Sequence, residues 1–262
     1  MDLHLAGDIA VVVGGARGLG RAIADAFQDE GARVVIIDRD PASDPGAREV
    51  AMRIVADVTD ATAMRDAAST IRASFSRCDH VVFAAAVGSG KLGFPFWRLE
   101  PGDWERVLRV NLSGAANVAH AFAPGMAEAG AGSFLFIASV AGQMGSQTDP
   151  PYSASKAGLI NFAQCAAKDL APHGVRVNAL SPGMIKTALN RSVYQSWAAR
   201  QPEGEAISYE EWADAKIKAL VPLQRWQTAE DVAAMTVFLA SKRAANITGQ
   251  TINVDGGQVM HA

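Results

Sequence analysis

Short apolar runs alternate with longer amphipathic segments along the chain. Six runs are apolar at most positions, as in strands buried on both faces of a sheet, and they cover residues 9–13, 33–37, 53–56, 80–84, 133–137 and 176–180. Helical spacing of apolar residues follows Gly20, recurs over 60–75 and about 102–126, and starts again near Tyr152 and Thr228. Turn-forming residues fill 41–46. This alternation predicts an α/β fold: a single doubly wound (Rossmann-type) domain over 1–262, with a parallel seven-stranded sheet and helices on both faces.

Residues 188–222 interrupt the alternation between the sixth strand and the last helix. They contain Tyr194, Trp197 and Trp212, and Ser208 and Glu211 have the spacing of a capping box. An insertion of this length in a compact domain is usually a lid or a disordered segment. The aromatic residues and the capped helix favour a lid over the substrate. The alternative is a fixed wall, in which the aromatics pack permanently against the sheet or a neighbouring subunit.

Composition narrows the class of protein. Apolar residues make up 49% of the 262 residues and charged ones 19%, which excludes a disordered chain. The net charge of −3 gives no basic surface for nucleic acid, and two cysteines form neither a disulfide framework nor a metal-ligand motif. No apolar run approaches the roughly 20 residues that span a bilayer, and the N-terminus lacks signal-peptide features. We therefore expect a soluble cytoplasmic protein without a metal, a membrane or a nucleic acid as partner.

A glycine-rich loop joins the first strand to the first helix. Gly14, Gly18 and Gly20 stand there in the spacing G-x-x-x-G-x-G, together with Arg17 and Leu19. Glycine lets the backbone turn sharply, so that its N–H groups approach a pyrophosphate at the positive end of the helix. The loop therefore predicts a dinucleotide site, and the alternative is a tight turn with no ligand.

Acidic residues end the next two strands at the same edge of the sheet. Asp38 closes the second strand, where a carboxylate accepts both hydroxyls of an adenosine ribose and repels a 2′-phosphate, which predicts NAD. The neighbouring Arg39 and the loop residue Arg17 could pair with that phosphate, so NADP stays open as the less favoured cofactor. Asp57 and Val58 end the third strand, where they could meet the adenine ring.

A tyrosine and a lysine stand four residues apart at the start of a helix, Tyr152 and Lys156. They share one helix face, and a nearby cation stabilises a phenolate. Ser139 follows the fifth strand at the ligand-binding edge, and Asn111 lies on an apolar helix stripe where its amide needs partners. The alternatives are a solvated lysine beside a core tyrosine and a structural core asparagine.

Together these residues resemble the short-chain dehydrogenase/reductase family, in its subdivision of roughly 250-residue chains. The likeness covers nearly the whole chain and extends to Ser181–Gly183, Ile247–Gly249 and Val254–Gly257. The resemblance implies that Tyr152 is the general acid/base and that Lys156 lowers its pKa and binds the nicotinamide ribose. It also implies that Ser139 hydrogen-bonds the substrate oxygen, and that Asn111 holds a water linking Lys156 to solvent.

The resemblance further implies nicotinamide contacts after the sixth strand, at Pro182, Gly183, Ile185 and Thr187. Two departures from the family pattern stand out. Val13 replaces the usual threonine before the glycine loop, and Phe83 to Ala86 replace the family's Asn-Asn-Ala-Gly, so that Ala84 and Ala85 lie beside the cofactor. These changes affect the bracing of the loop and not the chemistry.

The expected function is hydride transfer between NAD(H) and a secondary alcohol/ketone pair of the polyol, hydroxyketone or cyclic alcohol type. One alternative is an NADPH-dependent 3-oxoacyl reductase. Another, from a different class, is a nucleotide-sensing regulatory protein without catalysis. By resemblance the protein is a homo-oligomer, expected to be a tetramer, with subunit contacts at the helices around Asn111 and after Tyr152.

Overall fold

The sheet has seven parallel strands. The computed structural model describes residues 2–40, 48–146 and 148–260, so the turn-forming segment 41–46 lies outside the described residues. The strand order is β3-β2-β1-β4-β5-β6-β7. The bounds are β1 Ile9–Val13, β2 Arg33–Asp38, β3 Met52–Val55, β4 His80–Phe83, β5 Gly132–Ile137, β6 Val175–Pro182 and β7 Thr251–Val254. The chain runs outward from β1 in both directions, which confirms the doubly wound fold.

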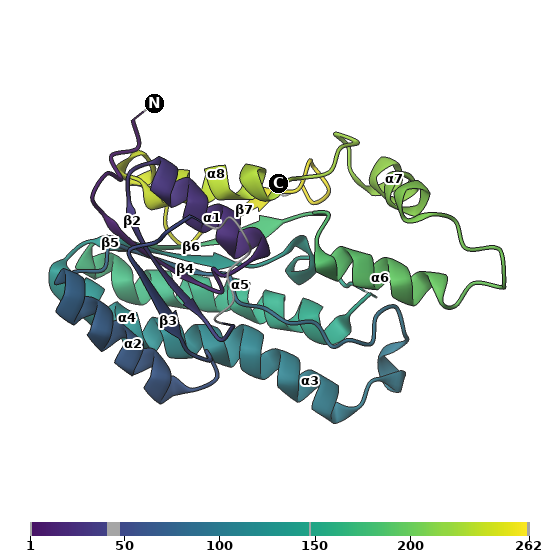
Figure 1. Ribbon diagram of the computed structural model, residues 1–262, viewed down its shortest axis with the longest axis horizontal. Coiled ribbons are helices and arrows are strands. Elements are labelled where there is room, and N and C mark those ends of the chain that lie inside the picture. The colour runs from purple at the N-terminus through teal and green to yellow at the C-terminus, as the bar shows by residue number, and fades with distance from the viewer. Residues whose placement is uncertain (1, 41–47, 147, 261–262) are drawn as a thin grey trace.

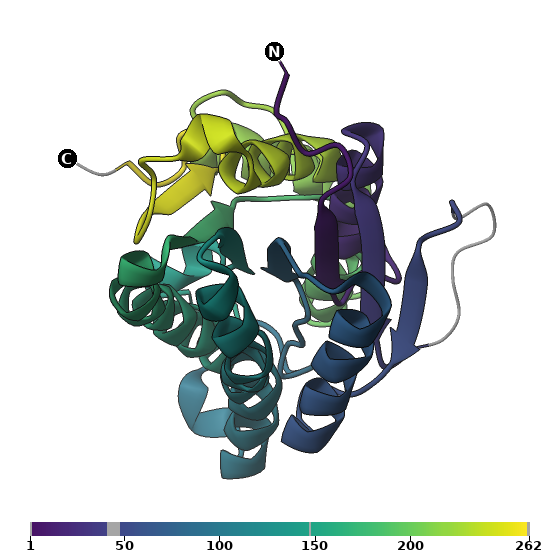
Figure 2. The same cartoon turned by 90° about the vertical axis from the view of Figure 1, so that its left-hand side faces the viewer.

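Helices cover both faces of the sheet, which accounts for strands that are apolar on both sides (Figure 2). One face carries α1 (Gly18–Asp29) and α8 (Ala229–Ala240), which pack against each other. The other carries α2 (Ala61–Phe75), α4 (Gly114–Ala129) and α5 (Pro150–Leu170). α3 (Pro101–Leu108) contacts α5. The core is therefore two apolar layers, and the edge where the strands end is left open.

Helix boundaries follow the capping chemistry in the sequence. The Asp60 carboxylate accepts hydrogen bonds from the first turn of α2, and Thr228 opens α8 with a capping box. The capping box predicted at Ser208 is confirmed, because its hydroxyl accepts the amide hydrogen of Glu211 at the start of α7 (Tyr209–Leu220).

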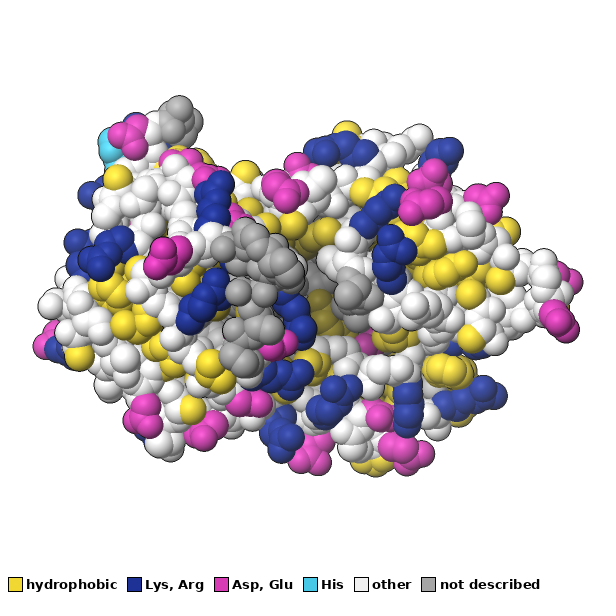
Figure 3. Space-filling model, in the orientation of Figure 1, with side chains coloured by type: hydrophobic (Ala, Val, Ile, Leu, Met, Phe, Trp, Pro, Cys, Tyr) yellow, Lys and Arg dark blue, Asp and Glu magenta, His cyan; other side chains and the backbone are white. Residues whose placement is uncertain are grey.

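Two predicted segments differ in detail. The long helix expected over about 102–126 is interrupted by a π-helical turn, Arg109–Ser113, between α3 and α4. The insertion 188–222 forms two helices, α6 (Ala188–Ala198) and α7, which extend beyond the carboxyl edge of the sheet (Figure 1). A hollow with hydrophobic side chains in its depth separates them from the body of the molecule (Figure 3).

Candidate active site

The glycine loop lies at the open edge of the sheet, where β1 enters α1. Gly14 has a φ of +84°, and a Cβ there would stand 2.6 Å from the amide nitrogen of Ala85. A Cβ on Gly20 would collide with the carbonyl oxygen of Gly14. No side chain fits at either position, so the loop stays close to the strands and leaves the N-terminus of α1 open to a phosphate.

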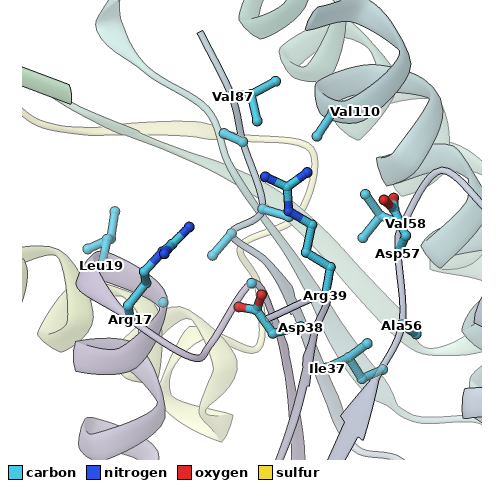
Figure 4. Close-up of a pocket in the computed structure, with 15 residues that line it drawn as sticks. Arg17, Leu19, Ile37, Asp38, Arg39, Ala56, Asp57, Val58, Val87 and Val110 are labelled. Carbon is cyan, nitrogen blue, oxygen red and sulfur yellow. The ribbon is translucent and has the colours of Figure 1, made fainter. Parts of the chain in front are cut away.

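Beside the loop is a pocket of about 230 Å³ (Figure 4). It contains most of the residues expected to bind the adenosine half of a dinucleotide. These are Gly14, Arg17, Leu19, Gly20, Asp38, Asp57, Val58, Ala84 and Ala85. Gly18, with a φ of +57°, turns the loop but does not line this pocket. Residues that the sequence analysis did not assign to the cofactor, among them Val87 and Val110, also line it.

Asp38 is held in place by backbone amides. One carboxylate oxygen accepts from Ala16 N at 3.0 Å and the other from Asp40 N at 3.1 Å. Arg17 forms an ion pair with Asp40 at 3.3 Å, and the Arg17 and Arg39 side chains reach into the pocket on either side of Asp38 (Figure 4). The pocket thus presents the Asp38 and Asp57 carboxylates together with two guanidinium groups. The preference between NAD and NADP depends on which of these charges lies nearer to the ribose 2′-group.

Asp57 and Val58 form the far wall of this pocket. A hydrogen bond from Thr59 N, at 2.8 Å, is the main reason that the pKa of Asp57 is lowered. The Val58 carbonyl accepts a hydrogen bond from the side chain of Asn117 at 2.9 Å. The side chain of Val58 packs against Gly114, where there is no Cβ. The third strand end is therefore fixed by α4.

A second, larger cavity of about 580 Å³ continues along the same edge. It shares Leu19, Ala84 and Ala86 with the first pocket, so the two form one groove. Ser139 and Tyr152 both line it, and the Ser139 side chain lies close enough to Tyr152 to affect its pKa. Burial raises the pKa of Tyr152 to about 12, the neighbouring Ser139 side chain opposes that rise, and the nearby Asp149 adds to it.

Lys156 lies beneath this pair and is only 1% exposed. Its ammonium group donates to the Ile137 carbonyl at 2.6 Å and lies 5.5 Å from the centre of the Tyr152 ring. Burial lowers its pKa to about 7. Tyr152 and Lys156 are therefore neighbours on one face of α5, as predicted.

Asn111 lies in the π-helical turn and does not line the cavity. Its amide donates to the Val87 carbonyl at 2.9 Å and to Ser155 Oγ at 3.0 Å, and its oxygen accepts from Val87 N at 2.8 Å. The fully buried amide ties the segment after β4 to α5. Its role in holding a water stays a prediction.

The segment after β6 forms the floor of the cavity. Pro182, Gly183, Ile185 and Thr187 all line it. A Cβ on Gly183 would stand 2.8 Å from Asp255 Cα, so the backbone passes very close to the segment after β7. Thr187 Oγ accepts from Asn190 N at 3.3 Å and so caps α6.

The cavity residues that the sequence analysis did not assign include Asp149, Lys216 and Gln258. Asp149 caps α5 and accepts Ser89 N at 2.9 Å, and the Asp-Pro-Pro sequence before Tyr152 is a helix-start signal that could have revealed it. Lys216 lies on α7 and Gln258 follows β7, and no local pattern marks either as a cavity residue. The Gln258 side-chain oxygen is buried without a hydrogen-bond donor.

The aromatic residues of 188–222 do not line the cavity. Tyr194, Trp197 and Trp212 pack with Tyr209 and Trp226 in a separate cluster that joins α6 to α7. In the described structure these rings pack against one another and not over the cavity, and their closure over a substrate stays a prediction. The cavity-facing residues of these helices are Asn190, Val193, Lys216 and Leu220.

Comparisons with known proteins identify the family of this chain. A family model described as enoyl-(acyl carrier protein) reductase matches residues 14–259. D-threitol dehydrogenase from Mycolicibacterium smegmatis is 34% identical over 266 residues, which cover 98% of this chain and 94% of that protein. Acetoacetyl-CoA reductase from Synechocystis is 35% identical over 257 residues, covering 98% of each. The chain belongs to the short-chain dehydrogenase/reductase family.

A solved structure extends the likeness to three dimensions. L-sorbose reductase from Gluconobacter frateurii, in complex with NADPH and L-sorbose, matches with a TM-score of 0.90 and 25% identity over 100% of both chains. This short-chain dehydrogenase/reductase therefore has the family's fold, and the family binds a nicotinamide coenzyme. Within the described residues, no helix is long and apolar enough to cross a membrane, and no group of three or more His, Cys, Asp or Glu could hold a metal ion.

Proposed function

We propose that the protein transfers a hydride between NAD(H) and a secondary alcohol/ketone pair. The observation that carries this proposal is that Ser139, Tyr152 and the buried Lys156 line one cavity, which is continuous with the glycine-loop pocket. The glycine cradle, too narrow for any Cβ, fits a dinucleotide. Gly14, Gly20 and Asp38 would hold its adenosine and phosphates, and Lys156, Ile185 and Thr187 its nicotinamide half. When bound, the coenzyme supplies the hydride donor or acceptor.

Each polar group of the site then has one task. Ser139 and Tyr152 donate hydrogen bonds to the substrate oxygen and fix the reacting carbon at the mouth of the nicotinamide part of the groove. Tyr152 passes its proton to that oxygen during reduction and receives one during oxidation. Lys156 stabilises the phenolate that remains after reduction, from beneath the ring. Because the pKa of Tyr152 is raised to about 12, the hydroxyl carries its proton at neutral pH, which favours its use as an acid towards a ketone.

The cavity favours a substrate with more than one hydroxyl. Its lining combines apolar side chains, Leu92, Val140 and Val193, with the polar Asn190 and Gln258. The buried oxygen of Gln258 has no donor, and a substrate hydroxyl would satisfy it. The relatives named above, a threitol dehydrogenase and a sorbose reductase, support the polyol or hydroxyketone type.

Asp38 supports NAD as the preferred coenzyme. Its carboxylate stands where a ribose 2′-group would lie, and a 2′-phosphate there would be repelled. The competing reading is NADP, held by Arg17 and Arg39, and the NADPH complex of the sorbose reductase supports that alternative. The similarity to an acetoacetyl-CoA reductase supports the second candidate function, that of an NADPH-dependent 3-oxoacyl reductase.

Residues 188–222 serve in this proposal as a substrate lid that moves as one piece. The aromatic cluster holds α6 to α7, and Tyr209 donates to Asn190 at 2.8 Å. Ser196 and Arg200 both bond the Leu92 carbonyl, which makes α6 the hinge side of the lid. Because the aromatic cluster holds α7 to α6, the two helices would move together about this contact.

A homo-oligomer, a tetramer by family resemblance, is also part of the proposal. The exposed Phe96 and Trp97 precede α3 and line, with Trp104 and Ala157, a broad apolar cavity beside α5. Burying such a surface favours association. Size-exclusion chromatography with light scattering tests this: a tetramer mass is expected, and a monomer at micromolar concentration would contradict it.

The function is tested by assaying NAD and NADP, in both directions, against secondary alcohols, polyols, hydroxyketones and ring ketones. We expect a coenzyme-dependent change in absorbance with at least one polyol or hydroxyketone, at higher kcat/KM with NAD. Tight coenzyme binding without any turnover would instead favour the nucleotide-sensing alternative.

A further inference from the structure

The substrate part of the groove contains a cation that the proposed hydride transfer does not use. The charged residues lining this cavity in the described chain are Asp149, Lys156 and Lys216. Asp149 accepts two backbone amides, and Lys156 donates to a carbonyl. Lys216 forms no ion pair with any described carboxylate, and its one polar contact is with a ring: its ammonium lies 4.6 Å from the centre of Trp212. Its charge is therefore available to a ligand.

The position of Lys216 is set by the packing of α7. Trp212, one turn earlier, is only 7% exposed and belongs to the aromatic cluster of the lid. The ring fixes the lysine stem and compensates part of the charge. Burial lowers the pKa of Lys216, and none of the ion pairs of the described residues supplies an opposite charge that would counter this effect. An anion entering the cavity would supply it.

The coenzyme phosphates and the neighbouring lysines do not compete for this role. The coenzyme phosphates belong at the glycine loop, and Lys216 does not line that pocket. Lys186, also near α7, is paired with Glu210 at 2.7 Å. Lys218, two residues further along α7, is exposed. Lys216 is therefore the lysine of the lid that a substrate would meet.

We propose that Lys216 binds an anionic group, a carboxylate or a phosphate, of a hydroxylated substrate whose reacting carbon lies at Ser139 and Tyr152. This inference rests on the proposed hydride transfer at the same site. It narrows the substrate class to hydroxy or keto acids and phosphorylated hydroxyketones. Binding of the anion would also favour closure of the lid, because an anion bound by Lys216 attracts α7 towards the rest of the cavity.

The test measures binding without turnover. A ketone and NAD form an abortive complex, so calorimetry on the full chain with saturating NAD reports affinity alone. The probes are matched pairs: 4-oxopentanoate against 4-oxopentanamide, 5-oxohexanoate against its amide, and dihydroxyacetone phosphate against dihydroxyacetone. The variants are Lys216→Met and, as the control on the exposed side of the same helix, Lys218→Met.

We expect the wild type to bind at least one anionic probe about 10- to 100-fold more tightly than its neutral partner, as for a hydrogen bond to a charged group. Lys216→Met should abolish that preference, and Lys218→Met should keep it. The acid pairs and the phosphate pair show which anion is the natural one. Equal affinity within every pair, or a preference that survives in Lys216→Met, would overturn the inference.

Failure of the proposed function has a different signature. If no probe is reduced with NADH or NADPH while the anion preference is present and depends on Lys216, the anion site stands and the hydride transfer falls. If ketones are reduced but acid and amide are reduced equally well by the wild type, the hydride transfer stands and the anion site falls.

Discussion

Replacing Lys156 with methionine should change how the stability of the folded protein depends on pH. The lysine is 1% exposed, and burial lowers its pKa from 10.5 to about 7. Between these two values the unfolded chain holds a proton that the folded chain has lost, so the wild type becomes more stable as the pH rises. Methionine has a similar length and no charge, and it removes this dependence.

The magnitude follows from the two pKa values of Lys156. One pKa unit corresponds to about 1.4 kcal/mol, so the burial penalty is largest at and below pH 7 and disappears near pH 10.5. Lys156→Met should therefore have a larger free energy of unfolding than the wild type at pH 7. At pH 9 this difference between the two proteins should be smaller by about 2 kcal/mol. Other titrating groups are common to both proteins and cancel in the difference.

The assay is urea unfolding of the coenzyme-free protein at pH 7, 8 and 9. Lys168→Met is the control, because Lys168 is exposed on the same helix and should follow the wild type at every pH. Parallel curves for the wild type and Lys156→Met would refute the reasoning, because they would mean that Lys156 stays charged in the folded protein.

Three further predictions concern coenzyme, pH and lid. Asp38→Ser should narrow the NAD/NADP ratio of kcat/KM at least ten-fold by removing the repulsion of a 2′-phosphate; an unchanged ratio would assign the choice to Arg17 or Arg39. Because the pKa of Tyr152 is raised, kcat/KM for alcohol oxidation should increase with pH above 7, whereas a flat profile from pH 7 to 10 would exclude tyrosine as the base. Limited proteolysis of the coenzyme-free protein should cut first at the exposed residues 202–206, and NAD with a bound keto acid should slow that cut, which a fixed wall would not show.

The fold could be predicted almost entirely from sequence periodicity. Strands that are buried on both faces and separated by amphipathic helices form a parallel sheet. Capping residues such as Asp60 and Thr228 then determine where the helices begin. The π-helical turn around Asn111 could not be predicted, because one extra residue in a helical turn changes no local propensity.

The site was predictable where one element carries the chemistry. Tyr152 and Lys156 share a helix face, and Gly14 and Asp38 end neighbouring strands, so spacing alone places them together. Lys216 and Gln258 come from α7 and the segment after β7, and only the folded chain brings them to the same cavity. The packing of Tyr194, Trp197 and Trp212 could not be predicted, because rings that could cover a substrate are equally able to pack against one another.

Turnover by Tyr152→Phe is the most direct test of the central claim, that this hydroxyl moves the proton that accompanies hydride transfer. The substitution removes one oxygen and leaves the ring, the helix and Lys156 in place. With the best substrate of the screen, we predict that NADH binding stays within about two-fold while kcat falls by about 10²- to 10⁴-fold, the usual contribution of general acid–base catalysis. A variant that binds NADH and turns over at near the wild-type rate would contradict the account.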